Sequence, residues 1–154
     1  MTEDKEKGMW KLTNGVYVIG SKNSAKINAL TGVWVTRVSY EPAMVAISIG
    51  EGRLTLDYIR ESKVFSINVL GNHQFDLVKH FGFQSGKNVD KFATVKHHIA
   101  KTGAPILDDA VAYMDCKVVQ EIKTGDHYLF IGEVVDEKVQ HQAEPMKYDK
   151  NRKE

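Results

Sequence analysis

The chain has 154 residues, with 21 basic and 20 acidic side chains, a net charge of +1 and a hydrophobic fraction of 42%. These values are ordinary for one globular domain, and the basic side chains form no cluster of the kind that binds phosphate backbones, so we expect no nucleic-acid partner. The single cysteine, Cys116, excludes an iron–sulfur or zinc site built from several cysteines of this chain.

The same features indicate where the protein works. Met1–Lys11 is charged and lacks the apolar segment of a secretory signal, and apolar stretches such as Ala43–Ile49 are too short to cross a membrane. A lone cysteine fits a reducing compartment. We therefore expect a cytoplasmic protein without a membrane partner. Residues 1–154 form one domain with a core from about residue 12 to 139, and the polar ends Met1–Gly8 and Glu144–Glu154 are expected to be loose.

The first half of the chain alternates short apolar runs with turn residues. Val16–Ile19 is β-branched and aromatic, and the polar Ser21–Ser24 predicts a turn after it. Val33–Tyr40 is also typical of a strand and is closed by Glu41 and Pro42. The apolar Ala43–Ile49 predicts a strand that is buried on both faces.

Two short helices and a strand follow. Thr55–Ser62 predicts a helix with Thr55 as its N-cap, and Val64–Leu70 returns to strand. Asn72 is a second candidate cap, for a helix through Phe81. The glycine-bearing segment Gly82–Asn88 then breaks the helical pattern.

The clearest periodicity lies near the C-terminus. Apolar residues at 112, 114, 116 and 118 alternate with polar or aromatic ones, which predicts a strand with one dry and one wetter face. Lys123–Asp126 predicts a hairpin turn, and His127–Val135 the returning strand. Six or seven strands with two short helices indicate a mainly β fold, an antiparallel barrel with appended helices.

Common catalytic and metal-binding patterns are missing. No zinc-protease, P-loop, dinucleotide-turn or nucleophile-elbow motif occurs. His97 and His98 are adjacent, so on a strand they would face opposite sides, and solvated loop histidines are the favoured interpretation over a metal site. Cys116 lies on the dry face of its predicted strand and is interpreted as a small core residue.

Three segments carry a more specific signal. They are Asn28–Pro42, with a strand that ends in Ser39 three residues before a proline; Phe65–Asn68, of the form Phe-x-x-Asn; and Gly125–Val134, which opens with Gly-Asp-His. In this order and spacing, from about residue 12 to 139, they resemble the flavin reductase-like, FMN-binding split-barrel family, which includes flavoredoxins and ferric reductases. The resemblance implies an antiparallel split β-barrel and a homodimer with one FMN per subunit near the interface.

The resemblance also implies site residues and a co-substrate. NADH or NADPH would meet the flavin beside the Gly-Asp-His turn, where Gly125, Asp126 and His127 would bind the substrate and His127 would orient the nicotinamide. Arg53 and Thr55, at the start of a predicted helix, would add phosphate contacts, and the first segment would hold phosphate and ring. The loop Gly82–Phe92 resembles the family's glycine- and serine-bearing loop that ends in Asp-Lys-Phe, and it would close over the flavin with Lys91 at the phosphate or at the pyrimidine carbonyls. The candidate FMN contacts are Asn28, Ala29, Leu30, Thr31, Trp34, Val35, Thr36, Arg37, Ser39, Arg53, Thr55 and Lys91.

Each candidate has a plainer structural interpretation. Trp34 would then be core, Arg37 a solvated strand residue, Thr55 only a helix cap, Asp126 only a turn residue, and Lys91 part of a surface loop. Val33 and Arg37 stand where many relatives have small hydroxyl residues, which leaves the phosphate contacts open.

Three hypotheses of function follow. The first is an oxidoreductase that passes a hydride from NADH or NADPH to FMN and onward to an acceptor. The second is a carrier with tightly bound FMN, or a reductase for ferric chelates or a redox protein. The third is a non-catalytic β-barrel module that binds flavin.

Overall fold

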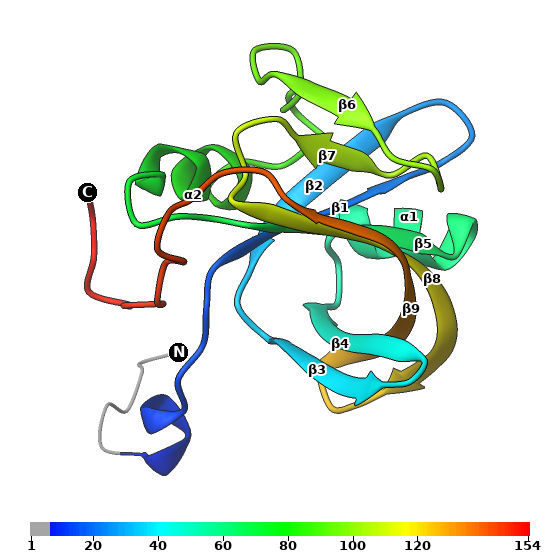
Figure 1. Ribbon diagram of the computed structural model, residues 1–154, viewed down its shortest axis with the longest axis horizontal. Coiled ribbons are helices and arrows are strands. Elements are labelled where there is room, and N and C mark those ends of the chain that lie inside the picture. The colour runs from blue at the N-terminus through cyan, green and yellow to red at the C-terminus, as the bar shows by residue number, and fades with distance from the viewer. Residues whose placement is uncertain (1–6) are drawn as a thin grey trace.

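The computed structural model describes residues 7–154, which form nine β-strands, two α-helices and one short 3-10 helix, η1 (Gly8–Lys11) (Figure 1). The helices are α1 (Leu54–Ser62) and α2 (Phe75–Gly82). The strands are β1 (Tyr17–Lys22), β2 (Ile27–Gly32), β3 (Val35–Tyr40), β4 (Ala43–Gly50), β5 (Val64–Val69), β6 (His97–Ile99), β7 (Pro105–Leu107), β8 (Ala112–Lys123) and β9 (His127–Val139).

Seven strands form one antiparallel sheet in the order β2-β1-β5-β8-β9-β4-β3, and β6 pairs with β7 in a separate hairpin. The sheet curls so that β3 and β4 lie apart from β1 and β2 (Figure 1). Its two edge strands, β2 and β3, are not hydrogen-bonded to each other, so the barrel stays open along one side. The expected mainly β, antiparallel split barrel with two short helices is confirmed.

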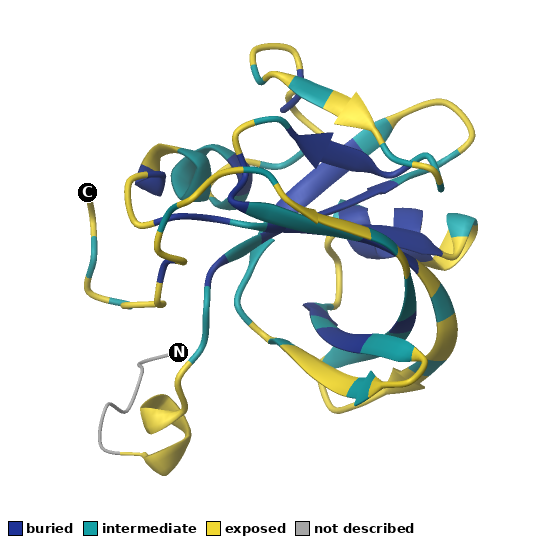
Figure 2. Cartoon of the chain, viewed as in Figure 1, coloured by how far each residue is buried: buried dark blue, intermediate teal, exposed yellow. Residues whose placement is uncertain are grey.

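The core lies inside the curl of the sheet. Phe65, Ile67 and Ile19 of the central strands are fully buried against Ile47 and Phe130 from the far side of the barrel. Figure 2 shows buried residues along these strands and on α1. A second apolar cluster lies beneath α2 and the loop that follows it. Cys116 is fully buried in the first cluster, as its place on the dry face predicted.

Three strands were not expected from the sequence. β2 contains Asn28 and Gly32, residue types that are rare in strands, and it forms because it pairs with β1 along its whole length. This pairing also carries β1 to Lys22, so the turn begins at Asn23 rather than at Ser21. β6 and β7 have three residues each, too few for a periodic pattern, and β6 places His97 and His98 on a strand instead of in a loop.

Both predicted helix caps were wrong. α1 begins one residue earlier, with Arg53 as its N-cap, and Thr55 lies within the first turn, where its hydroxyl accepts a hydrogen bond from Asn28. α2 has Gln74 at its N-cap rather than Asn72. The Gln74 side chain is held elsewhere, since its amide binds the Asp109 carbonyl at 2.6 Å and its oxygen the Gly71 N–H at 2.9 Å.

Two further expectations need correction. Asp115 was placed on the wetter face of its strand but is fully buried, because the Thr102 hydroxyl and N–H donate to its carboxylate at 2.5 and 3.0 Å. The C-terminal segment was expected to be loose, yet Met146 is 2% exposed and bridges join Pro145 to Gly71 and Lys147 to Gly15.

The remaining expectations on the ends of the chain and its location stay open. Met1–Glu6 lies outside the described residues, so the expected loose N-terminus is untested there. Within residues 7–154, no helix has both the length and the apolar character that crossing a membrane requires. The cytoplasmic location and the single-domain boundaries stay predictions.

Candidate functional site

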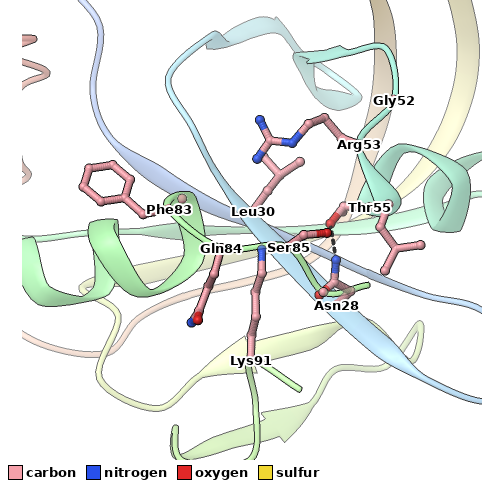
Figure 3. A pocket seen from close by; sticks show the side chains of 12 residues that line it. Asn28, Leu30, Gly52, Arg53, Thr55, Phe83, Gln84, Ser85 and Lys91 are labelled. Atoms are coloured by element: carbon pink, nitrogen blue, oxygen red, sulfur yellow. Dashed lines mark hydrogen bonds between the residues drawn. The ribbon is translucent and has the colours of Figure 1, made fainter. Parts of the chain in front are cut away.

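Two adjoining cavities lie where β2 meets the start of α1, the end of β4 and the loop after α2. The larger has a volume of about 360 Å³, and Figure 3 shows its side chains converging from these separate elements. Its lining comprises Asn28, Leu30, Gly52, Arg53, Leu54, Thr55, Gly82, Phe83, Gln84, Ser85, Gly86 and Lys91.

The larger cavity has two cationic side chains in its lining and no carboxylate. Arg53 makes no ion pair among residues 7–154. Lys91 is 3% exposed, and its Nζ donates to the carbonyls of Ala29 at 2.8 Å and Phe81 at 2.9 Å. Burial, and secondly the charge of Arg53, lower the pKa of Lys91 to about 8. Two positive charges without a neutralising acid give this cavity a polarity that suits an anion.

The backbone and two buried polar side chains add donors to the same space. Asn28 and Thr55 are almost fully buried, and the Asn28 Nδ2 donates to the Thr55 Oγ1 at 3.0 Å (Figure 3). The Thr55 oxygen therefore acts as acceptor in that bond, and its own O–H is left to donate to another group. No side chain caps α1, so the first N–H groups of this helix also favour an anion.

The loop after α2 closes one side of the larger cavity. At Gly86, a Cβ atom would lie 2.2 Å from the Asn28 Oδ1, so only glycine permits this close approach. The Gln84 side chain is tied back to α2 by a 2.8 Å bond to the His80 carbonyl. Phe83 remains 74% exposed at the cavity. The expected closure of this loop over a flavin stays a prediction.

The smaller cavity, of about 180 Å³, combines apolar and aromatic side chains with the polar Thr31, Ser48 and Arg53. The rings of Trp34 and His127 lie 4.6 Å apart at an interplanar angle of 38° along it. Leu30 and Arg53 line both cavities, so the two spaces adjoin each other. The full lining is Leu30, Thr31, Gly32, Val33, Trp34, Ser48, Ile49, Gly50, Arg53 and His127.

Many of the predicted site residues therefore meet, although they are far apart in sequence. The larger cavity is lined by the predicted residues Asn28, Leu30, Arg53, Thr55 and Lys91. The smaller cavity is lined by Leu30, Thr31, Trp34, Arg53 and His127. Ala29 contributes through its carbonyl on Lys91, since its side chain is fully buried. Trp34 is 46% exposed, so its interpretation as a core residue was wrong.

Other predicted residues lie outside both linings. The edge strand β3 carries four of them, Val35, Thr36, Arg37 and Ser39. The Arg37 guanidinium lies 5.8 Å from the centre of the Tyr40 ring on the same strand. Gly125 and Asp126 are at the tip of the β8–β9 hairpin, and neither is in the lining of these two cavities. Their roles toward cofactor and substrate stay predictions.

Some lining residues were not among the predicted contacts. Gly50 and Ser48 come from the end of β4, and Gly52 and Leu54 flank Arg53. The signal that points to them is their adjacency to Arg53 and the pair of glycines that ends β4, since a glycine lets a ligand approach the backbone.

The family model for the flavin reductase like domain matches residues 9–154. The "High molecular weight rubredoxin" of Moorella thermoacetica is 35% identical over 144 residues, which cover 92% of this chain and 63% of that protein. The "Ferric-chelate reductase (NAD(P)H)" of Archaeoglobus fulgidus is 30% identical over 90% of this chain and 83% of its own length. The chain thus spans less than two thirds of the rubredoxin that it matches.

Solved structures share the fold. The NADH:FAD oxidoreductase SgcE6 of Streptomyces globisporus C-1027 superposes with a TM-score of 0.86 at 26% identity, covering 99% of this chain and 94% of that one. An FMN-binding protein of Thermus thermophilus gives a TM-score of 0.81 at 28% identity over 91% of this chain and 79% of its own. These proteins are what the chain is similar to in sequence and fold.

Proposed function

The chain belongs to the flavin reductase like family, and on that premise we propose that it binds FMN and transfers electrons to it from NADH or NADPH. One observation carries the proposal: a cavity with two cations and no acid adjoins a second cavity whose lining includes two aromatic rings and several apolar side chains. FMN has the matching polarity, with a phosphate at one end and a flat ring system at the other.

The phosphate end of the cofactor fits the larger cavity. Arg53 and Lys91 would supply charge, while the Thr55 hydroxyl and the first N–H groups of α1 would donate hydrogen bonds. The buried Asn28 side chain would hold Thr55 in place through the 3.0 Å bond between them. The two cations without a neutralising acid match the two negative charges that the phosphate of FMN carries at neutral pH.

The ring end fits the smaller cavity. Leu30 and Trp34 offer an apolar wall, and His127 lies opposite a glycine at the end of β4. A bound flavin supplies the redox chemistry: it accepts a hydride, so the dinucleotide is oxidised by two electrons and the flavin is reduced by two. The chain's own residues bind the two partners, exclude water and set their relative orientation.

The experiment is a spectral titration. The purified protein is saturated with FMN, and the flavin absorbance is followed while NADH or NADPH is added without oxygen. Bleaching by either dinucleotide is expected. FMN that neither binds nor is reduced would overturn the proposal, and FAD run in parallel shows which of the two flavins binds more tightly.

A second candidate function is a carrier with retained flavin, or a ferric-chelate reductase. The similarity to the Archaeoglobus fulgidus enzyme over most of both chains favours it. Retention of the flavin through gel filtration, followed by its reoxidation on addition of a ferric chelate, would select this candidate. Loss of flavin on the column would select the form in which flavin is exchanged as a substrate.

We further propose that the chain is a homodimer. On the open edge of the sheet, Val38 of β3 is 49% exposed and Tyr40 is 83% exposed, close in sequence to Trp34 of the smaller cavity. A second copy would cover these side chains and could bring the predicted contacts of β3 toward a flavin. Light scattering checks this, and a monomer mass at micromolar concentration would contradict it.

A further inference from the structure

Lys91 presents its amine to the larger cavity from a buried position. Figure 3 shows its side chain reaching from the loop after α2 toward the centre of the cavity, with the nitrogen at its leading end. Nζ donates to the carbonyls of Ala29 at 2.8 Å and Phe81 at 2.9 Å, and neither of these residues is in the cavity lining. Two of the three bonding directions that the carbon chain leaves open at Nζ are therefore engaged, and the third is left for a group in the cavity.

This arrangement suits a neutral amine as well as an ammonium ion. A neutral primary amine has two N–H groups, which match the two carbonyls, and one lone pair, which then takes the third direction. Burial, and secondly the charge of Arg53, lower the pKa of Lys91 to about 8, so roughly a tenth of the side chain is neutral at about pH 7. Desolvation and a neighbouring cation are the two means by which proteins make a lysine amine nucleophilic.

The surroundings of this amine suit a reagent that carries its own phosphate. Arg53 makes no ion pair among residues 7–154, and the Thr55 O–H is left to donate because its oxygen accepts from Asn28. The first N–H groups of α1, which no side chain caps, also favour an anion. In a small acyl phosphate, a carbonyl carbon is bonded to a phosphate oxygen. Groups that hold the phosphate in this cavity would therefore bring the carbonyl carbon to the Lys91 amine.

We propose that Lys91 is an acylation site whose reagent is a small acyl phosphate bound in the larger cavity. The neutral Nζ attacks the carbonyl carbon and a C–N bond forms, while the bond from that carbon to the phosphate oxygen breaks and inorganic phosphate leaves with the electron pair. The nitrogen gives up one proton to the phosphate or to solvent, so no oxidant or reductant takes part. The product is an uncharged amide, and the cavity loses one of its two cations. Phosphate ligands should then bind less tightly; for FMN this consequence rests on the proposed function.

The test compares two lysines of one loop and two acetylating reagents. The full chain is treated with acetyl phosphate or with acetic anhydride, which has no phosphate, and the acetylation of each lysine is followed by mass spectrometry of its peptides. Lys87 is the internal control, because it is exposed in the same loop as Lys91 and outside both cavity linings. The ratio of the two rates cancels the difference in overall reactivity between the reagents.

With acetyl phosphate we expect Lys91 to react at least about tenfold faster than Lys87, because a bound reagent is held beside its nucleophile. With acetic anhydride this preference should vanish or reverse, since Lys91 is buried. The rate at Lys91 should rise with pH and level off above about 8, where the amine is neutral. Excess inorganic phosphate should slow the reaction at Lys91 and leave that at Lys87 unchanged. The same ratio of rates with both reagents would overturn the proposal.

Two variants separate recruitment of the phosphate from reactivity of the amine. Arg53→Gln, checked for folding by thermal unfolding, should reduce the preference of acetyl phosphate for Lys91 about tenfold, because the phosphate loses a cation. Lys87→Ala should leave the acetylation of Lys91 unchanged. If unmodified protein does not bind FMN, the proposed function fails, while the rates at the two lysines still decide the acylation site. A folded Arg53→Gln protein that keeps the wild-type preference for Lys91 would refute the role of the cavity in binding the reagent.

Discussion

Raising the pH through about 8 is expected to weaken FMN binding, because Lys91 loses its proton there. A phosphate dianion binds the ammonium form better than the neutral amine. The affinity for FMN should therefore be highest below the pKa of Lys91 and fall by as much as about tenfold for each pH unit above it. With a pKa of about 8, the ammonium fraction drops from roughly 0.9 at about pH 7 to roughly 0.1 at about pH 9, which predicts about a tenfold weaker affinity.

The charge of the ligand does not change over this range, because a phosphate monoester, with a second pKa of about 6, is already a dianion. The charge of Arg53 contributes to the low pKa of Lys91, so Arg53→Gln should weaken binding throughout and move the pH step upward. Lys91→Met should bind FMN weakly and without the step.

Quenching of flavin fluorescence, titrated at a series of pH values, measures the affinity. Riboflavin is the matched ligand control, since it has the ring and the ribityl chain but no phosphate, and its affinity should lack the step. Lys91→Met removes the donor to the Ala29 and Phe81 carbonyls, so its thermal unfolding is recorded as well. The same pH step with riboflavin, or an unchanged step in folded Lys91→Met, would refute the reasoning.

Three further outcomes are expected. Gly86→Ala should weaken the binding of both FMN and riboflavin at least about tenfold, because its Cβ would lie 2.2 Å from the Asn28 Oδ1 and the loop must move. The control is Gly8→Ala, where nothing lies within 4 Å of the new Cβ. If Gly86→Ala binds both ligands as tightly as wild type does, the close approach of the loop to Asn28 is contradicted. Phe65→Ala should lower the free energy of unfolding by about 3–5 kcal/mol in urea, since this ring is fully buried against Gly132, and a loss below about 1 kcal/mol would mean that the site collapses to fill the space. Cys116 should resist thiol reagents in the native protein and react in denaturant, because burial raises the pKa of its thiol; rapid native labelling would count against its place in the core.

Local patterns were sufficient for the main elements of the fold. Three of the predicted segments form strands: Ala43–Ile49, Val64–Leu70 and the alternating residues 112–118. Their apolar side chains are buried because an extended backbone directs them into the core of the barrel. The hairpin at Lys123–Asp126 was also predictable, since turn residues fix a reversal locally. The resemblance of three segments then indicated the family, and with it the kind of ligand.

The cavity itself depended on the tertiary structure. The sequence could propose Asn28, Arg53 and His127 as separate candidates, but only the folded sheet places them along one space. The same holds for the helix caps, since Thr55 was predicted to cap α1 and instead binds Asn28, 27 residues away. Lys91 is the sharpest case, because its ammonium meets the carbonyl of Ala29, 62 residues earlier, in a buried position. Its charge was visible in the sequence, but its lowered pKa follows from burial and from the neighbouring Arg53, which only the packing of distant segments creates.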